Sequence, residues 1–367
     1  MRGSILILIN HIGGLFVFRK EVVKAIVDNG FSVVISAPND DSRAEYFVSL
    51  GCQIIKSPLN RRGTNPLADI KLLAHYRKLI RTYNPVAVLT YTIKPNVYGG
   101  IACRLTKTPQ FANVTGLGDA IENGGLLQRL TLWMYKRGLA KAKTVFFQNA
   151  TNQKLFIDNK IVKGETVLLP GSGVNVDYHQ TQPYPSEDSS IVFLFIGRLL
   201  KDKGIEELFQ ATEFIKSKYP FTEFRILGDS EGDYKGRLDS LVSKGIINYL
   251  GTTTDVRPYF TDVHCSIMPS FHEGMSNVNL ESSANGRPVI TTDVPGCRET
   301  VDDGITGYIV KARDSQDLID KVERFINLPY DEKKKMGEAA REKVVREFNR
   351  DIVVEAYLDA IKSIANV

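Results

Sequence analysis

The feature that most constrains the fold of this chain is a repeated alternation of short β-branched runs with longer amphipathic stretches. In the first half, the runs that indicate strands are residues 4–9, 31–36, 86–90, 110–114 and 144–148. Between them apolar side chains recur every three or four residues, as from Leu67 to Ile80, which is the period of a helix packed on one face. This alternation predicts a parallel sheet covered by helices.

The alternation pauses at residues 182–190, a polar stretch with two prolines that is typical of a linker. It then restarts, with expected strands at residues 191–196, 224–227, 246–250, 265–268 and 289–291. A chain of 367 residues is long enough for two domains, each with its own core. We therefore predict an α/β fold of two Rossmann-like doubly wound domains facing across a cleft. The predicted parts are a domain over 1–182, a domain over 183–348 and a terminal segment over 349–367.

The composition excludes several classes of protein. Apolar residues make up 43% and charged residues 24% of the chain, as in ordinary globular proteins. No apolar run reaches the roughly 20 residues of a membrane span, and the first run is too short for a secretory signal. The four cysteines lie far apart in the sequence, without the spacing of a zinc site. We expect reduced core thiols, a cytosolic location and no metal or other cofactor.

Charge is distributed unevenly along the chain. Residues 1–180 carry 23 Lys+Arg and 11 Asp+Glu, a net +12, whereas residues 181–367 carry 24 and 31, a net −7. The first half therefore favours an anionic partner, either a phosphate, a membrane surface or a nucleic acid, unless it is simply a solvated basic face. Nucleic acid is not expected, because no aromatic-rich binding module accompanies the charge.

Several of these cations lie in two places in the first half, an Arg-Arg pair and a predicted helix. Arg61 and Arg62 are adjacent, and five more cations follow in the predicted helix near residues 126–143. That helix also carries seven apolar side chains between Leu126 and Tyr135. Part of this apolar set must be core, so we expect only a fringe to be available to a lipid surface.

Two carboxylates eight residues apart mark the strongest candidate site. Glu273 follows the expected strand 265–268, and Glu281 lies in the helix that comes next. The spacing alone is not informative, since the pairs Glu223/Glu231 and Glu347/Glu355 share it. The context differs: the loop before this helix contains Gly274, Ser276 is a suitable helix cap, and Gly286 and Pro288 follow the helix as stop signals.

This strand, loop and helix arrangement has a physical use. Backbone N–H groups around Met275, Ser276 and Asn277 would point out of the helix N-terminus, where the helix dipole helps to hold a diphosphate. Glu281 would accept hydrogen bonds from two vicinal hydroxyls such as those of a ribose, and Glu273 would face whatever is attached beyond the phosphate. The alternative is a loop glutamate and a helix-surface glutamate without function.

A second constellation follows the expected strand 191–196. The segment from Gly197 to Gly204 contains Arg198 and Lys203, which would place two cations at a strand's carboxyl end, where a departing diphosphate is neutralised. By itself this is weak, because arginine and lysine are common in exposed turns. Ligands of doubly wound sheets bind outside the carboxyl ends of strands, so both constellations are expected in one place.

The first half lacks a familiar phosphate motif. Strand 4–9 is followed by Gly13 and Gly14, which would open a helix at Leu15, but neither G-x-G-x-x-G nor a P-loop is present, so NAD binding and P-loop phosphate transfer lose support. Gly14 is a candidate for approach to a phosphate or sugar, or a plain turn former. The loops after two other expected strands are candidates for the acceptor side: they contain Lys94, Asn96, Thr115 and Gly116.

Taken together, these motifs resemble family 4 of the retaining GT-B glycosyltransferases. The residues that carry the likeness are Gly197-Arg198, Lys203-Gly204, Glu273-Gly274, Glu281 and the segment that begins at Gly286. The resemblance implies that Arg198 and Lys203 bind the diphosphate, Glu281 the ribose and Glu273 the donor sugar, with the leaving phosphate helping to deprotonate the acceptor. It also implies that the last helix, near residues 349–364, crosses back to the first domain. The nucleotide that it implies is UDP. No D-x-D motif is present, so metal-independent transfer is expected.

The block from Tyr91 to Gly99, with residues 114–118, looks like the subgroup that extends polyprenyl-diphosphate-linked sugars in bacterial surface glycan assembly. The resemblance therefore implies a nucleotide-sugar donor, a glycan or lipid-linked acceptor and a peripheral contact with the inner face of the cell membrane. Many relatives have a histidine near Thr115, which this chain lacks. Two alternatives stay open: a sugar-nucleotide epimerase of the same fold, and a non-catalytic protein that binds a sugar nucleotide.

Overall fold

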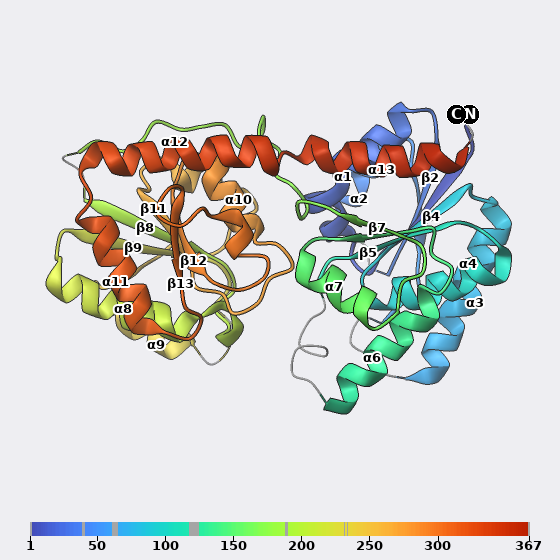
Figure 1. Ribbon diagram of the computed structural model, residues 1–367, viewed down its shortest axis with the longest axis horizontal. Coiled ribbons are helices and arrows are strands. Elements are labelled where there is room, and N and C mark those ends of the chain that lie inside the picture. The colour runs from blue at the N-terminus through green and yellow to red at the C-terminus, as the bar shows by residue number, and fades with distance from the viewer. Residues whose placement is uncertain are drawn as a thin grey trace. The chain divides into compact units, whose positions relative to one another are not determined.

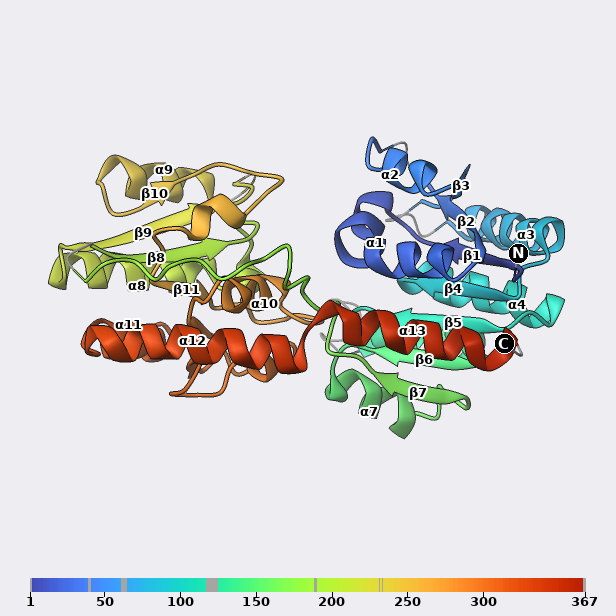
Figure 2. The same cartoon turned by 90° about the horizontal axis from the view of Figure 1, so that it is seen from above.

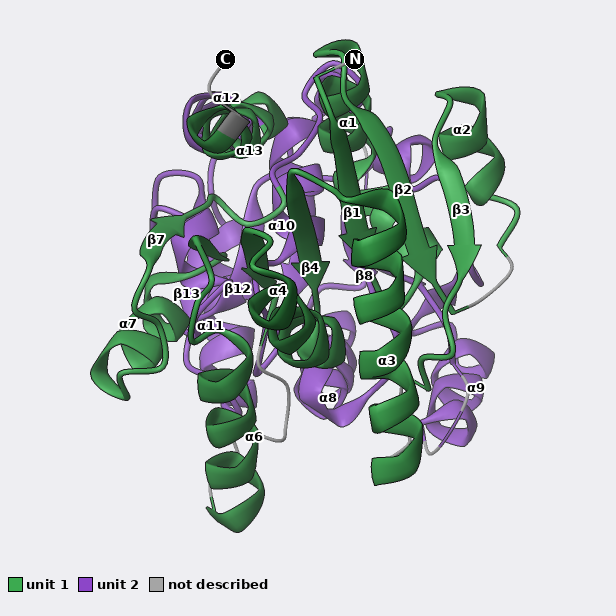
Figure 3. Ribbon diagram, turned by 90° about the vertical axis from the view of Figure 1, so that its right-hand side faces the viewer, with its two compact units in different colours: residues 1–172, 350–367 green, residues 173–349 purple. Residues whose placement is uncertain are grey.

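The chain forms two compact units. A computed structural model describes residues 2–38, 41–60, 65–116, 125–187, 190–230, 232 and 234–365. Unit 1 comprises residues 1–172 and 350–367, and unit 2 comprises residues 173–349 (Figures 1 and 3).

Unit 1 contains a seven-stranded parallel sheet. Its strands are β1 (Ser4–Leu8), β2 (Ser32–Ala37), β3 (Gln53–Lys56), β4 (Ala87–Tyr91), β5 (Gln110–Val114), β6 (Thr144–Phe147) and β7 (Glu165–Leu168). They lie in the order β3-β2-β1-β4-β5-β6-β7 (Figure 2). The first strand is central and completely buried from Ile5 to Leu8, which explains its continuous apolar run.

Helices cover both faces of this sheet. One group consists of α1 (Ile12–Asp28), α2 (Ala44–Ser49) and α13 (Arg350–Ala365), whose apolar side chains share one core cluster. The other face carries α3 (Pro66–Tyr83), α4 (Gly100–Thr106), α6 (Gly125–Gly138) and α7 (Ala150–Asp158). The last helix of the chain thus packs in unit 1, where Arg350 forms an ion pair with Glu21 at 2.9 Å.

Unit 2 repeats the plan with six parallel strands. These are β8 (Ile191–Ile196), β9 (Thr222–Leu227), β10 (Asn248–Tyr249), β11 (Cys265–Met268), β12 (Val289–Thr292) and β13 (Gly307–Val310), in the order β10-β9-β8-β11-β12-β13. The largest core cluster joins the sheet to α8 (Ile205–Lys218), α9 (Lys235–Ser243) and α11 (Ser315–Ile326). A further cluster joins α10 (Asn277–Ala284) to α12 (Tyr330–Glu347). The prediction of two doubly wound α/β domains is confirmed.

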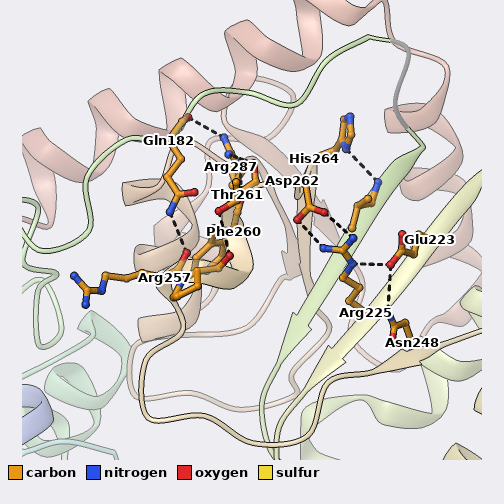
Figure 4. A network of polar contacts seen from close by, with 12 residues as sticks. Gln182, Glu223, Arg225, Asn248, Arg257, Phe260, Thr261, Asp262, His264 and Arg287 are labelled. Atoms are coloured by element: carbon orange, nitrogen blue, oxygen red, sulfur yellow. Dashed lines mark hydrogen bonds and ion pairs between the residues drawn. The ribbon is translucent and has the colours of Figure 1, made fainter.

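The predicted linker is fastened to unit 2, and the chain enters that unit at residue 173, not at 183. Gln182 donates from its amide to the Arg257 carbonyl at 3.0 Å (Figure 4). The Pro183 carbonyl accepts from Arg287 at 2.8 Å. Arg287 is completely buried and also donates to the carbonyls of Phe260 and Thr261. A buried guanidinium needs acceptors for its five N–H groups, and the polar linker supplies two of them through its backbone.

The cysteines lie in the core, as expected. All four are buried and have free thiols. Burial raises the pKa of the Cys52 thiol to about 11. Within the described ranges, none of the helices is both long enough and apolar enough to cross a membrane.

A buried histidine is expected to make unit 2 less stable in acid. His264 is 3% exposed, and its Nδ1 accepts a hydrogen bond from the Val192 backbone N–H at 3.1 Å. Burial lowers the pKa of His264 to about 4, and the neighbouring Lys333 and Arg287 add to this effect. The unfolded chain therefore binds more protons than the folded chain between about pH 4 and 6.5.

We expect His264 to remove about 2 kcal/mol from the free energy of unfolding between pH 7 and pH 5. Denaturant titrations at a series of pH values measure this loss. In His264→Asn the amide oxygen still serves as an acceptor for the Val192 N–H. The contribution of His264 to the pH dependence of the free energy of unfolding should vanish in this variant. If the free energy of unfolding fell equally in the variant and the parent between pH 7 and 5, the acid sensitivity would come from other groups.

Candidate functional site

The loop after β8 is held against the end of β11. Gly204 has a φ of 69°, in the left-handed region, and a Cβ at this position would lie 2.0 Å from the Pro269 carbonyl oxygen. Only glycine permits that approach. The Phe271 N–H donates to the Asp202 carbonyl at 2.7 Å, which ties the two loops together. The cations of the first loop are thereby placed beside the loop that carries Glu273.

Lys203 and Glu273 form an ion pair across these two loops. Lys203 Nζ lies 2.6 Å from Glu273 Oε1, and the two side chains are 17% and 19% exposed. Arg198, which follows the last residues of β8, is exposed. The structure therefore brings together the two residues that the sequence placed at the diphosphate and the sugar. Because the pair is mostly shielded from water, its attraction is weakened less by salt than that of a surface pair.

The N-terminus of α10 is capped as the sequence predicts. Ser276 Oγ accepts a hydrogen bond from the Asn279 N–H at 3.4 Å, and the Ser276 N–H donates to the Gly296 carbonyl at 2.7 Å. Gly296 has a φ of 84°, and its missing side chain leaves room for the carbonyl oxygens of Glu273 and Gly274. The first-turn N–H groups of α10 have no partner within the helix, so this end can hold an anion.

Two predicted residues of this loop, Met275 and Ser276, have buried side chains, so their backbone N–H groups are what a ligand could reach. The Met275 side chain is 6% exposed and packs against Leu280 and Phe348, and Ser276 is 2% exposed. Asn277 differs, since its Oδ1 is buried and no described residue donates to it. An unpaired buried acceptor costs about 1–3 kcal/mol, and several other buried polar atoms of the described residues are in the same state. Glu281 lies in the second turn of α10 and is partly exposed.

Sequence reasoning missed residues that hold this loop from behind. Asn279 is completely buried and donates to the hydroxyl oxygens of Thr291 and Thr300 at 3.1 and 2.9 Å. Glu299 accepts from the Gly296 N–H at 2.7 Å. The Pro295-Gly296 dipeptide is a turn signal that would have pointed to this segment.

The candidates on the acceptor side lie in unit 1 and differ in what they can do. Lys94 forms an ion pair with Asp69 at 2.6 Å, and the Tyr98 hydroxyl donates to the same carboxylate at 2.8 Å. Asn96 has no exposed surface, and its amide bonds to Thr90 and to the Asn113 carbonyl. Asn96 therefore does not lie at the surface where the sequence analysis placed it, because its polar atoms are used within the core.

Thr115 and Gly116 follow β5 and are partly exposed. With its amide oriented to satisfy both groups, Gln148 donates to the Thr115 carbonyl at 3.1 Å and accepts from the Arg19 guanidinium at 3.0 Å. Arg19 is 2% exposed and also bonds to the Tyr357 hydroxyl at 3.3 Å. A buried network reaching the last helix thus holds the Thr115 carbonyl. Gly118 lies outside the described residues.

Gly14 lies in the first turn of α1, which begins at Ile12, not at Leu15. The earlier start has a local cause: His11 caps the helix, its Nδ1 accepting from the Gly14 N–H at 2.9 Å. Sequence reasoning missed this cap because histidine is not among the preferred capping residues.

The predicted site residues fall into two groups, one in each unit. Unit 2 carries Arg198, Lys203, Glu273, Gly274, Met275, Ser276, Asn277 and Glu281, and unit 1 carries Gly14, Lys94, Asn96, Thr115 and Gly116. Among the described residues there is no group of three His, Cys, Asp or Glu side chains that would hold a metal ion. In unit 2, cations and a helix N-terminus are thus gathered at the carboxyl ends of two parallel strands.

Two family models match this chain, and together they cover most of it. Residues 4–149 match the family described as glycosyl transferase 4-like, and residues 179–343 match glycosyl transferases group 1. The chain is similar to a Campylobacter jejuni protein, the N,N'-diacetylbacillosaminyl-diphospho-undecaprenol alpha-1,3-N-acetylgalactosaminyltransferase. They are 23% identical over 95% of this chain and 96% of that one. It is also similar to the capsular polysaccharide biosynthesis glycosyltransferase CapM of Staphylococcus aureus, at 27% identity over 80% and 81% of the two chains.

Solved structures share the fold of the whole chain. A glycosyltransferase from Rickettsia africae has a TM-score of 0.80 at 20% identity, covering 99% of this chain and 98% of that one. HepE of Anabaena, in complex with UDP and glucose, has a TM-score of 0.79 at 17% identity, covering 98% and 100% of the two chains. At these identities the likeness concerns the fold.

Proposed function

Since this chain belongs to the glycosyltransferases and has their GT-B fold, we propose that it is a retaining enzyme that uses a UDP-sugar as donor. The sugar is a hexose or an N-acetylhexosamine, and the acceptor is a glycan linked to a polyprenyl diphosphate. The observation that carries the proposal is the Lys203–Glu273 pair, placed by β8 and β11 beside the N-terminus of α10.

The donor is bound through its diphosphate and its ribose. The first-turn N–H groups of α10 and the cations Arg198 and Lys203 receive the diphosphate, while Glu281 accepts hydrogen bonds from the ribose hydroxyls. UDP is proposed because HepE, a protein of the same fold, has been solved with UDP and glucose. These protein cations take the place that a divalent metal has in other transferases, so transfer is proposed to be independent of metal.

In the transfer step, the bond between the sugar C1 and the diphosphate oxygen breaks, and a bond from C1 to the acceptor oxygen forms on the same face. The acceptor proton passes to the departing phosphate. Glu273 faces the donor sugar, and Lys203 holds its carboxylate in place at 2.6 Å. Charge on the diphosphate grows as the bond breaks, so Lys203 and Arg198 stabilise the transition state more than the ground state.

The acceptor is proposed from the relatives. The Campylobacter jejuni protein acts, by its name, on an undecaprenol-linked diphospho-sugar, and CapM belongs to capsule synthesis. Lys94, Thr115 and Gly116 are the proposed contacts on the acceptor side. A lipid-linked acceptor requires the enzyme to work at the cytoplasmic face of a membrane, which the net charge of +12 in residues 1–180 would favour.

The proposal is tested by a donor screen. Release of UDP or GDP from a panel of sugar nucleotides is measured with and without a lipid-linked saccharide acceptor, and with and without a chelator. Acceptor-dependent UDP release that resists the chelator, with a product of retained anomeric configuration, is expected. Conversion of a UDP-sugar to its epimer without acceptor would indicate the epimerase, and nucleotide binding without any turnover would indicate a non-catalytic protein.

We expect Glu281→Ala to weaken UDP binding by at least about tenfold, because each hydrogen bond from a hydroxyl to a carboxylate contributes about 1.5–3 kcal/mol. Calorimetric titration with UDP measures the change. Glu338→Ala is a matched control, because Glu338 is an exposed helix glutamate in the same unit. Equal affinity in the two variants would remove Glu281 from the ribose site.

A further inference from the structure

Helix α6 exposes large apolar side chains to water. Leu126, Leu130 and Trp133 are 84%, 51% and 54% exposed, and their spacing of four and three residues places them on one stripe of the helix. The opposite stripe, which includes Thr131 and Tyr135, is buried. Among the described residues, the core of unit 1 therefore covers one face of α6 and leaves the leucine and tryptophan face exposed. Figures 1 and 3 show α6 projecting beyond the sheet of unit 1.

The rim of this apolar stripe is basic. Arg129, Lys136 and Arg137 are exposed on the same helix, and the Arg137 guanidinium lies 5.1 Å from the centre of the Trp133 ring. Lys141 and Lys143 follow directly, and the sequence has no acidic residue from 125 to 143. We call the exposed side chains Leu126, Leu127, Arg129, Leu130, Trp133, Lys136 and Arg137 the α6 face.

Such a face is suited to one environment in particular. A helix with leucine and tryptophan on one side and lysine and arginine at its edge lies in the headgroup region of a bilayer, where the apolar groups leave water and the cations meet anionic lipids. Tryptophan favours this interface because its ring is apolar and its N–H is polar. We propose that the α6 face docks on an anionic lipid surface, with Leu126, Leu130 and Trp133 inserted between headgroups.

Charge argues against a second copy of this chain as the occupant. In a symmetric dimer each α6 face would meet the same face of the partner, so its cations would lie opposite identical cations without any acid on the helix to compensate. An anionic bilayer has the complementary charge. The inference rests on the proposed function in one respect: a polyprenyl-linked acceptor makes a bilayer the surface that this enzyme must reach.

The test is sedimentation of the full chain with vesicles. Vesicles of phosphatidylcholine with increasing fractions of phosphatidylglycerol are used at low and at high salt. A triple variant, L126Q/L130Q/W133Q, removes the apolar stripe, and R129Q/K136Q removes part of the rim. The matched control is F221Q/I305Q, because Phe221 and Ile305 are 53% and 62% exposed in unit 2.

The parent chain should sediment with anionic vesicles and detach at high salt, because the contribution of the exposed cations is screened. Each removed cation should weaken binding about fivefold, equivalent to about 1 kcal/mol per basic residue. The triple variant should bind at least about tenfold more weakly at any salt concentration, since apolar insertion is lost. The control variant should bind as the parent does, and circular dichroism should show all variants equally helical.

Binding of the triple variant equal to that of the parent would overturn the proposal. A second outcome would also overturn it: neither protein binds vesicles, and the parent forms a concentration-dependent dimer that the triple variant does not form. The α6 face would then be an interface between copies of the chain. The result is separable from the proposed function, because sedimentation needs no turnover. If transfer occurs, the triple variant should keep its rate on a water-soluble acceptor and lose rate on the same saccharide in vesicles.

Discussion

Glu273→Gln should fold and bind UDP as the parent does but lose about 10²–10³-fold in kcat. The substitution keeps the volume of the side chain and removes the negative charge that lies 2.6 Å from Lys203 Nζ. In the proposed mechanism that charge faces the donor sugar as positive charge develops at C1, so its loss weakens transition-state binding more than ground-state binding. Steady-state kinetics with the donor found in the screen, beside calorimetric UDP titration, measure the two effects separately.

Glu213→Gln is the matched control for this prediction. Glu213 is also a glutamate paired with a cation in unit 2, with Arg237 Nη2 at 3.3 Å, but it lies in α8, away from the loops of the site. It should keep the parent's kcat. Full turnover in Glu273→Gln would remove Glu273 from the mechanism, and a loss of UDP affinity as large as the loss of kcat would make it a nucleotide-binding residue.

Lys203→Ala and Arg198→Ala should each lower kcat more than they weaken substrate binding. Lys203 should have the larger effect, about 10²-fold or more, because it is 17% exposed and also holds Glu273, whereas Arg198 is exposed to solvent and its field is screened. The ratio of kcat to KM for each variant, compared with kcat alone, separates loss of transition-state stabilisation from loss of binding.

Lys201→Ala provides the control, since Lys201 is an exposed lysine in the same short turn as Lys203. The double variant Lys203→Ala/Glu273→Gln should be less impaired than the product of the two single effects, because the residues act as a contacting pair. If both cation variants kept kcat and changed only KM, the leaving-group role would be wrong.

The central strands of both sheets were predictable because they are buried on both faces. Such strands read as continuous apolar runs, and β5, β8 and β11 have the predicted bounds. The sequence prediction missed β3, β7 and β13. Strands β3 and β7 are four residues long with exposed ends, so their local pattern is too weak to separate them from loops. They become strands because a neighbouring strand offers its backbone.

For the candidate site, the sequence predicted which residues follow the carboxyl ends of parallel strands, but not the contacts that these residues make. The carboxyl ends of such strands share one edge of a sheet, which is why Arg198 and Glu273 were expected in one place. The same reasoning failed for Asn96. A polar residue after a strand reads as a surface residue, and only the positions of Thr90 and Asn113 show that its amide is consumed in the core.

The sequence by itself therefore determined two doubly wound units and the loops that we propose carry the chemistry, because hydrophobic period and strand ends are local properties of the chain. Tertiary structure decided the contacts that give the site its form. Lys203 meets Glu273 because Gly204 lets one backbone approach the Pro269 carbonyl of another. The predicted linker is fixed because a buried Arg287 needs its carbonyls. The face that α6 turns to solvent follows from which of its stripes the core of unit 1 covers; helical periodicity alone did not distinguish the two apolar sides.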